Sequence, residues 1–331
     1  MVASGLSLCV CLGLVVASSQ PEAAQSESRR ETPPYWAYAI NPPEQPAGER
    51  AAVEDKTPQR VPGSSVTFTL LEVADMFKVP DWHPSLHPPM PGIVAMGRKP
   101  EVFACGYCHL PNGQGRPENA SLAGLPVGYI LEQMADFKNG LRKSSDPRHK
   151  PVASMIAYET KASDEELQAA ASYFSGIKLQ PWIRVVETAQ VPKTRVAGWM
   201  LIPSQPGGME PIGRRIIEMP ESLERTELRD DTSGFVAYVP SGSINKGKAL
   251  VTGGANGRTV ACGTCHGADL KGLGDVPSIA GRSPSYIVRQ LFDIRGGARH
   301  GAKTQPMTPV VEKLTLDEMI SIAAYTASLK P

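Results

Sequence analysis

Two short stretches of this chain share one pattern, Cys-x-x-Cys-His. They read ACGYCHL from Ala104 and ACGTCHG from Ala261, so each cysteine pair is followed directly by a histidine, His109 or His266. This spacing is typical of three kinds of site: zinc sites, dithiol redox sites and covalent haem attachment sites. The rest of the sequence has to decide between them.

The number and positions of the cysteines argue against the first two kinds of site. Two of the six cysteines fall in an apolar N-terminal stretch, and the other four all belong to the motifs: Cys105, Cys108, Cys262 and Cys265. A zinc ribbon sets its pairs about 15 to 20 residues apart, whereas Cys262 follows Cys105 by 157 positions. A thioredoxin-like site requires a βαβ context that neither motif has, and it gives no reason for the histidines.

Haem attachment accounts for every fixed residue of the motif. The two thiols add to the vinyl groups of the porphyrin, and the imidazole that follows becomes the proximal ligand of the iron. The sequence therefore predicts two covalently attached haem c groups, one on Cys105 and Cys108 and one on Cys262 and Cys265. His109 and His266 are the predicted iron ligands.

The motifs lie inside a longer internal repeat. LAGLPVGYILEQMADFKNGLR (122–142) aligns without a gap on IAGRSPSYIVRQLFDIRGGAR (279–299), and both stretches have the periodicity of amphipathic helices. Further on, SDEELQ from Ser163 matches TLDEMI from Thr315, and each opens with a capping-box pattern that predicts another helix. We therefore expect two copies of one unit: a short helix, the motif, a middle helix and a terminal helix.

A methionine stands at the same place in both copies. Met155 precedes Ser163 by eight residues and Met307 precedes Thr315 by eight, and both are expected in the loop between two helices. A single methionine more often fills a core, but two at equivalent positions favour iron ligation. A thioether is a soft, neutral donor that raises the reduction potential, as suits an electron carrier.

The remaining histidines do not follow the repeat. His83 and His87 lie in a Pro-rich stretch and are expected to be ordinary loop residues. His149 and His300 each follow an arginine, but the alignment does not make them equivalent.

The two units resemble class I cytochrome c domains, and together they resemble the bacterial tandem dihaem cytochromes c. The resemblance covers about half of the chain and implies the same roles for the cysteines, histidines and methionines named above. In such domains a proline about eleven residues after the histidine offers its carbonyl to the second imidazole nitrogen. Pro277 fits this pattern, but the first unit has Ala120 there, and Leu110 replaces Gly267.

The expected fold is mainly α. Two helical haem domains, residues 96–178 and 243–331, are joined by an irregular, β-containing segment, residues 179–242, in which RVAGWMLIP and GRRIIEMP suggest a hairpin. A Pro-rich extension, residues 26–95, precedes them and contains SVTFTLLEV, expected as a strand. Residues 1–25 suggest a signal peptide, whose apolar run is too short to span a bilayer.

These features predict a periplasmic protein that carries electrons between a redox enzyme, a dehydrogenase or reductase, and a respiratory acceptor, without being an enzyme itself. The net charge of +1 and the absence of a like-charged block argue against nucleic-acid binding. No transmembrane span is expected after signal cleavage. The alternative is a dihaem peroxidase or sulfur-compound oxidoreductase with a labile site at the first haem, near His83, His87 or His149. The connection between Arg142 and Met155 is five residues longer than its counterpart, so we also expect inequivalent haems.

Overall fold

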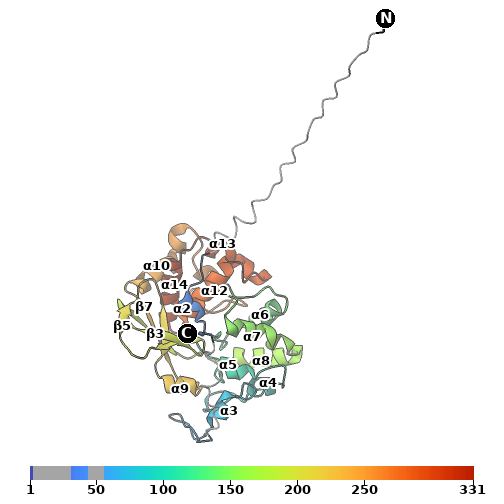
Figure 1. The fold of residues 1–331 in the computed structure, drawn as a ribbon, viewed down its shortest axis with the longest axis vertical. Coiled ribbons are helices and arrows are strands. Elements are labelled where there is room, and N and C mark those ends of the chain that lie inside the picture. Colours follow the sequence, from blue (N-terminus) through green and yellow to red (C-terminus); the bar gives the residue numbers. More distant parts are fainter. Residues whose placement is uncertain (3–30, 44–55) are drawn as a thin grey trace. The chain divides into compact units, whose positions relative to one another are not determined.

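Two sets of helices follow the order that the repeat predicts (Figure 1). The protein is seen in a computed structural model that describes residues 1–2, 31–43 and 56–331. Of the suggested signal peptide, residues 3–25 lie outside the described residues. Residues 33–331 form one unit, to which the following description applies.

The first set contains α4 (Gly92–Ala95), α5 (Cys105–His109), α6 (Val127–Lys138), α7 (Lys150–Ala157), η1 (Glu159–Lys161) and α8 (Asp164–Gly176). The second set contains α10 (Ser243–Gly257), α11 (Gly263–His266), α12 (Pro284–Arg295), η2 (Ala302–Met307), α13 (Thr308–Val311) and α14 (Leu316–Ser328). In Figure 1 α6, α7 and α8 lie together in green, and α10, α12 and α14 lie together in orange and red.

The terminal helices begin where the capping boxes place them. The Ser163 hydroxyl accepts from the backbone N–H of Glu166, and the Glu166 carboxylate accepts from the backbone N–H of Ser163 at 2.7 Å. Thr315 and Glu318 form the same reciprocal pair at the start of α14. Each box satisfies two N–H groups that a helix start leaves without partners, which confirms both predicted helix starts.

The helix before the motif differs between the two sets. In the second set, α10 packs against α14, and Gly247 makes the close approach: a Cβ there would lie 1.9 Å from the carbonyl oxygen of Ser321. In the first set only the four-residue α4 precedes the motif, and it ends at Ala95, just before the expected domain boundary at residue 96. A helix thus precedes each motif, as the repeat predicts, but it is four residues long in the first set and fifteen in the second.

The connecting segment contains seven short strands and one helix. They are β1 (Ile183–Thr188), β2 (Gln190–Pro192), β3 (Thr194–Ala197), β4 (Met200–Pro203), β5 (Met209–Pro211), β6 (Ile217–Pro220), α9 (Leu223–Glu227) and β7 (Phe235–Pro240). β7 lies between β1, which is parallel to it, and β6, which is antiparallel; Ile183 pairs with Phe235 and Ile217 with Tyr238. β2 pairs with β5, and β3 with β4.

The β-like runs of the sequence are strands, but their pairing differs from the expectation. The hairpin lies within RVAGWMLIP, as β3 and β4, and turns at Gly198 and Trp199, which both have positive φ. The run GRRIIEMP supplies β6, which pairs with β7 instead of closing a hairpin with RVAGWMLIP. Strand propensity was readable from the sequence, whereas the choice of partner depends on contacts distant in the chain.

The described part of the N-terminal extension is helical where a strand was expected. It contains α2 (Tyr35–Tyr38) and α3 (Leu70–Ala74). The stretch SVTFTLLEV forms an isolated bridge at Phe68 and then α3, whose start is fixed by a capping box between Thr69 and Glu72. The strand prediction is wrong because this local cap outweighs the β propensity of the valines and threonines.

Among the described residues no helix combines the length and the apolar character needed to cross a bilayer.

Candidate functional site

The first motif forms a single turn of helix, α5, that presents His109 in one fixed orientation. The Nδ1 atom of His109 lies 2.8 Å from the carbonyl oxygen of Ala120. Donation from Nδ1 to this carbonyl places the proton there and leaves the lone pair of Nε2 available for a metal. Burial lowers the pKa of His109 to about 4, so the imidazole is neutral at pH 7, as iron ligation requires.

The second motif repeats this arrangement on α11. The Nδ1 atom of His266 lies 2.8 Å from the carbonyl oxygen of Pro277, and burial lowers the pKa of His266. Ala120 therefore supplies the same carbonyl as Pro277 at the same distance. The side chain at this position does not alter the hydrogen bond, since a backbone oxygen accepts it in both units.

The residue after each histidine has a positive φ, 62° at Leu110 and 83° at Gly267. With ψ near 155° and 151° both residues lie in a region that glycine adopts without strain, whereas it costs a leucine about 1–3 kcal/mol. The backbone of the first motif therefore follows the same path as the second despite the substitution. The replacement noted in the sequence leaves the position of the imidazole intact.

A cavity of about 330 Å³ opens directly on the first motif. Cys105, Cys108 and His109 line it together with Met155. Apolar side chains from α6 and α8 line it as well, among them Ile130, Met134, Phe137, Leu167 and Phe174. Its size lies in the usual range for cofactor sites, and two thiols, an imidazole and a thioether are the groups that a class I haem requires. The residues present fit a covalently bound haem.

The two methionines lie on short helices, which corrects the prediction of loops. Met155 belongs to α7, and Met307 is the last residue of η2, directly before α13. Met307 and Cys262 both pack against the large hydrophobic cluster to which α10, α12 and α14 contribute. The structure thus brings Met155 to the first motif and places Met307 on the same cluster as the second.

Charged groups gather around the first cavity as well. Arg116, Arg142, Arg229 and Arg289 line it, and so do Glu118, Glu159 and Asp293. Such cations suit the two propionate carboxylates that a haem brings. Burial raises the pKa of Glu159 to about 7. Arg142, Arg289 and Asp293 lie in the aligned stretches 122–142 and 279–299. Arg116, Glu118, Glu159 and Arg229 lie outside them, and no sequence pattern pointed to their position at the cavity.

The middle helices of the two units contact each other through equivalent residues. Arg142 lies just after α6, and Arg299 lies just after α12. Each guanidinium donates to the glutamine of its own helix and to the tyrosine and the glutamine of the other helix. The acceptors are Gln133, Tyr286 and Gln290 for Arg142, and Gln290, Tyr129 and Gln133 for Arg299, at 2.9 to 3.1 Å. The repeat is thus also a symmetric interface, and it extends the first cavity to Tyr286 and Gln290 of the second unit.

The other four histidines do not line this cavity. His83 is buried beside Asp230, and His87 contacts Asp81 and the hydroxyl of Tyr173. His149 is buried just before α7, whereas His300 is exposed. His83 is therefore not the ordinary loop residue that the sequence suggested.

Comparisons with known proteins point to one family. The family model described as Cytochrome c matches residues 99–178. Cytochrome c4 from Stutzerimonas stutzeri is 30% identical over 238 residues, which cover 69% of this chain and 86% of that protein. The thiosulfate dehydrogenase electron acceptor of Stutzerimonas stutzeri (strain A1501) is 24% identical over 267 residues, covering 74% of this chain and 96% of that protein. The crystal structure of reduced recombinant cytochrome c4 from Pseudomonas stutzeri aligns with 68% of this chain and 93% of that chain, at 21% identity and a TM-score of 0.44.

Proposed function

This chain belongs to the cytochrome c family, as a dihaem cytochrome c with two covalently bound haem c groups, and on that premise we propose that it carries electrons in the periplasm between a redox enzyme and a respiratory acceptor. One observation carries the proposal: Met155 lines the same cavity as Cys105, Cys108 and His109. An iron held by an imidazole and a thioether has no side reserved for a substrate.

The residue roles that we propose are the same in the two units. Cys105 and Cys108 bind the first haem and Cys262 and Cys265 the second, while the iron ligands are His109 with Met155 and His266 with Met307. The bound haem supplies one-electron chemistry. The protein holds each imidazole by a carbonyl at 2.8 Å and surrounds the first site with apolar side chains that exclude water.

For the electron donor we propose a dehydrogenase that oxidises a sulfur compound. Support comes from the relatives named thiosulfate dehydrogenase electron acceptor, one of which aligns over 96% of its length. The relatives named cytochrome c4 are not named after an electron donor. The proposed donor therefore rests on the relatives named thiosulfate dehydrogenase electron acceptor. The suggested signal peptide at residues 1–25 supports export.

The proposal is tested by mixing the oxidised dihaem protein with a thiosulfate dehydrogenase and thiosulfate, and following haem reduction by absorbance in a stopped-flow instrument. We expect both haems to be reduced only when enzyme and thiosulfate are both present. Two controls test for enzyme activity: thiosulfate without the dehydrogenase, and hydrogen peroxide added together with an excess of a chemical reductant. Neither should give catalytic turnover. Turnover in either control would contradict the carrier function, and failure of the thiosulfate dehydrogenase to reduce the haems would contradict the proposed donor.

A further inference from the structure

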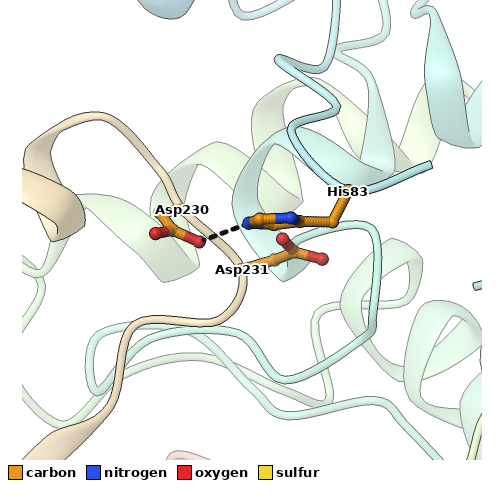
Figure 2. Close-up of side chains that lie close together, drawn as sticks. All are labelled: His83, Asp230 and Asp231. Carbon is orange, nitrogen blue, oxygen red and sulfur yellow. Dashed lines mark hydrogen bonds and ion pairs between the residues drawn. The ribbon is translucent and has the colours of Figure 1, made fainter. Parts of the chain in front are cut away.

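A second cluster of metal-ligating side chains lies outside the haem sites, in the two segments that do not belong to the repeat. His83 comes from the N-terminal extension, and Asp230 and Asp231 come from the turn between α9 and β7 (Figure 2). One potential ligand atom from each of the three residues lies within 4.8 Å of those of the other two. All three are buried, with exposed fractions of 6%, 2% and 1%.

The two carboxylates of this cluster differ in their partners. Asp230 is fully engaged: Oδ1 lies 3.1 Å from Nε2 of His83 and accepts from the N–H of Thr232, while Oδ2 accepts from Nε of Arg225 at 2.7 Å. Neither oxygen of Asp231 has a hydrogen-bond partner among the described residues. Burial raises the pKa of Asp231 to about 6. A buried carboxylate without a partner is costly, and its presence calls for a bound group that satisfies it.

One pair of ligand atoms has the spacing that is found around a single metal ion. Two ligand atoms that each lie about 2.1 Å from a metal, at an angle of roughly 95° to 109°, are about 3.1 to 3.4 Å apart. The distance of 3.1 Å between Nε2 of His83 and Oδ1 of Asp230 falls in this range. Figure 2 shows the carboxylate of Asp231 next to this pair, on one side of the imidazole. A water molecule could also donate hydrogen bonds to Asp231, but it would not account for the three potential ligand atoms that lie close together.

We propose that His83, Asp230 and Asp231 bind one divalent transition-metal ion of the zinc class. An imidazole with two carboxylates suits zinc, whereas calcium and magnesium prefer sites made of oxygen alone. Two carboxylates beside one guanidinium leave a net charge of −1, which favours a divalent cation. Arg225 fixes Asp230 through the oxygen that does not face His83, as outer partners of metal-binding carboxylates do.

The ion would fasten the extension to the connecting segment beside the first haem cavity. Asn112, shortly after the first motif, donates to the backbone carbonyl of Asp231. Arg229, next to Asp230, lines the cavity; its guanidinium lies 3.6 Å from the ring centroid of Tyr107 and donates to the Tyr107 carbonyl at 2.8 Å. The site is thus structural, and it holds a cavity-lining arginine in place.

The test is a zinc titration of the full dihaem protein without an affinity tag. The protein is treated with EDTA, desalted, incubated with Zn²⁺ and desalted again, and zinc and iron are then measured by mass spectrometry. Because two haems supply two irons, we expect one zinc per two irons. Asp231→Asn and His83→Gln should each weaken zinc binding by about tenfold or more in calorimetry, and millimolar Ca²⁺ or Mg²⁺ should not displace the ion.

A matched control lies close by. His87 and Asp81 form a pair with the same atoms at the same 3.1 Å distance, but no residue in the described part of the chain completes a group of three ligands with them. His87→Gln should therefore keep one zinc per chain with unchanged affinity, and an unaltered haem spectrum verifies that each variant is folded. Failure of the unmutated protein to retain zinc would overturn the proposal. Zinc affinity in Asp231→Asn or His83→Gln as high as in the unmutated protein would also overturn it, as would a loss of affinity in His87→Gln as large as in those two variants.

Discussion

At the scale of single residues, the proposed iron ligands are tested by removing one thioether at a time. A thioether bound to ferric haem gives a weak near-infrared charge-transfer band, and it raises the potential of its iron. We expect Met155→Ala and Met307→Ala each to remove part of this band and to lower the potential of one haem. Near-infrared absorption and a redox titration of each variant measure both effects.

Met134 offers a control for these variants because it lines the same cavity as Met155 from a different helix, α6. Met134→Leu conserves volume and should leave the band at full intensity. A band that survives in both alanine variants would show that other groups bind the two irons.

A second residue, His149, is expected to make the stability depend on pH. Its side chain is 1% exposed, neither ring nitrogen has a partner among the described residues, and its ring meets that of Tyr38 edge-on. Burial lowers the pKa of His149 to about 2, whereas the unfolded value is near 6.5. Below pH 6.5 the unfolded chain therefore binds a proton that the folded protein does not, and the free energy of unfolding falls by at most about 1.4 kcal/mol per pH unit.

His149→Phe should remove this part of the acid sensitivity. Urea unfolding at pH 7 and pH 5 measures the change in the free energy of unfolding between the two pH values. His300 is exposed, so His300→Phe should show the same change as the unmutated protein. If His149→Phe showed the same change in the free energy of unfolding as the unmutated protein, the imidazole of His149 would take up its proton in the folded state as well.

At the scale of elements, the packing of α10 against α14 depends on one glycine. A Cβ at residue 247 would lie 1.9 Å from the Ser321 carbonyl, so Gly247→Ala forces the helices apart and should cost about 2 kcal/mol or more. Gly253 is on the same helix with nothing within 4 Å of its Cβ position, and Gly253→Ala should stabilise by about 0.4–1 kcal/mol. Thermal unfolding compares the two variants, and equal stability would contradict the close contact.

The elements that the sequence predicted well are those with local signals. The capping boxes at Ser163 and Thr315 fixed two helix starts, and the aligned stretches fixed α6 and α12. The β-branched residues before Thr69 led to a wrong strand prediction, because the cap that Thr69 forms with Glu72 was not taken into account. The helical positions of Met155 and Met307 were not predicted because short helices next to Pro carry a weak periodic signal.

At the scale of the whole molecule, the parts that escaped prediction are contacts between distant segments. The repeat identified Arg142 and Arg299 as equivalent, but not that each reaches across to the other unit. The cluster of His83 with Asp230 joins residues 147 apart in two segments that have no internal counterpart. Spacing within a motif specifies covalent chemistry and local structure, whereas such contacts depend on how the segments pack.

The last prediction is that the two haems differ in reduction potential. The structure indicates a different cause for this than the longer connection before Met155. The longer connection before Met155 is held at two points: the backbone N–H of Lys143 donates to the Ala298 carbonyl at 2.7 Å, and the backbone N–H of Ser145 donates to the Asp293 carboxylate at 2.8 Å. The position shared by Ala120 and Pro277 does not separate the units either, because both carbonyls accept at the same distance.

What differs is the surroundings of the two motifs. Arginines and carboxylates line the first cavity, including Arg229 and Asp293 from outside its own unit, whereas Cys265 of the second motif is exposed. Potentials respond to nearby charge and solvent exposure, and about 59 mV is a tenfold change in a one-electron equilibrium. A spectroscopic redox titration should therefore resolve two steps separated by tens of millivolts. Arg229→Gln removes one positive charge beside the first cavity, so it should lower one potential and leave the other in place. A single step in the unmutated protein, or an equal shift of both steps in the variant, would show that these surroundings do not set the potentials.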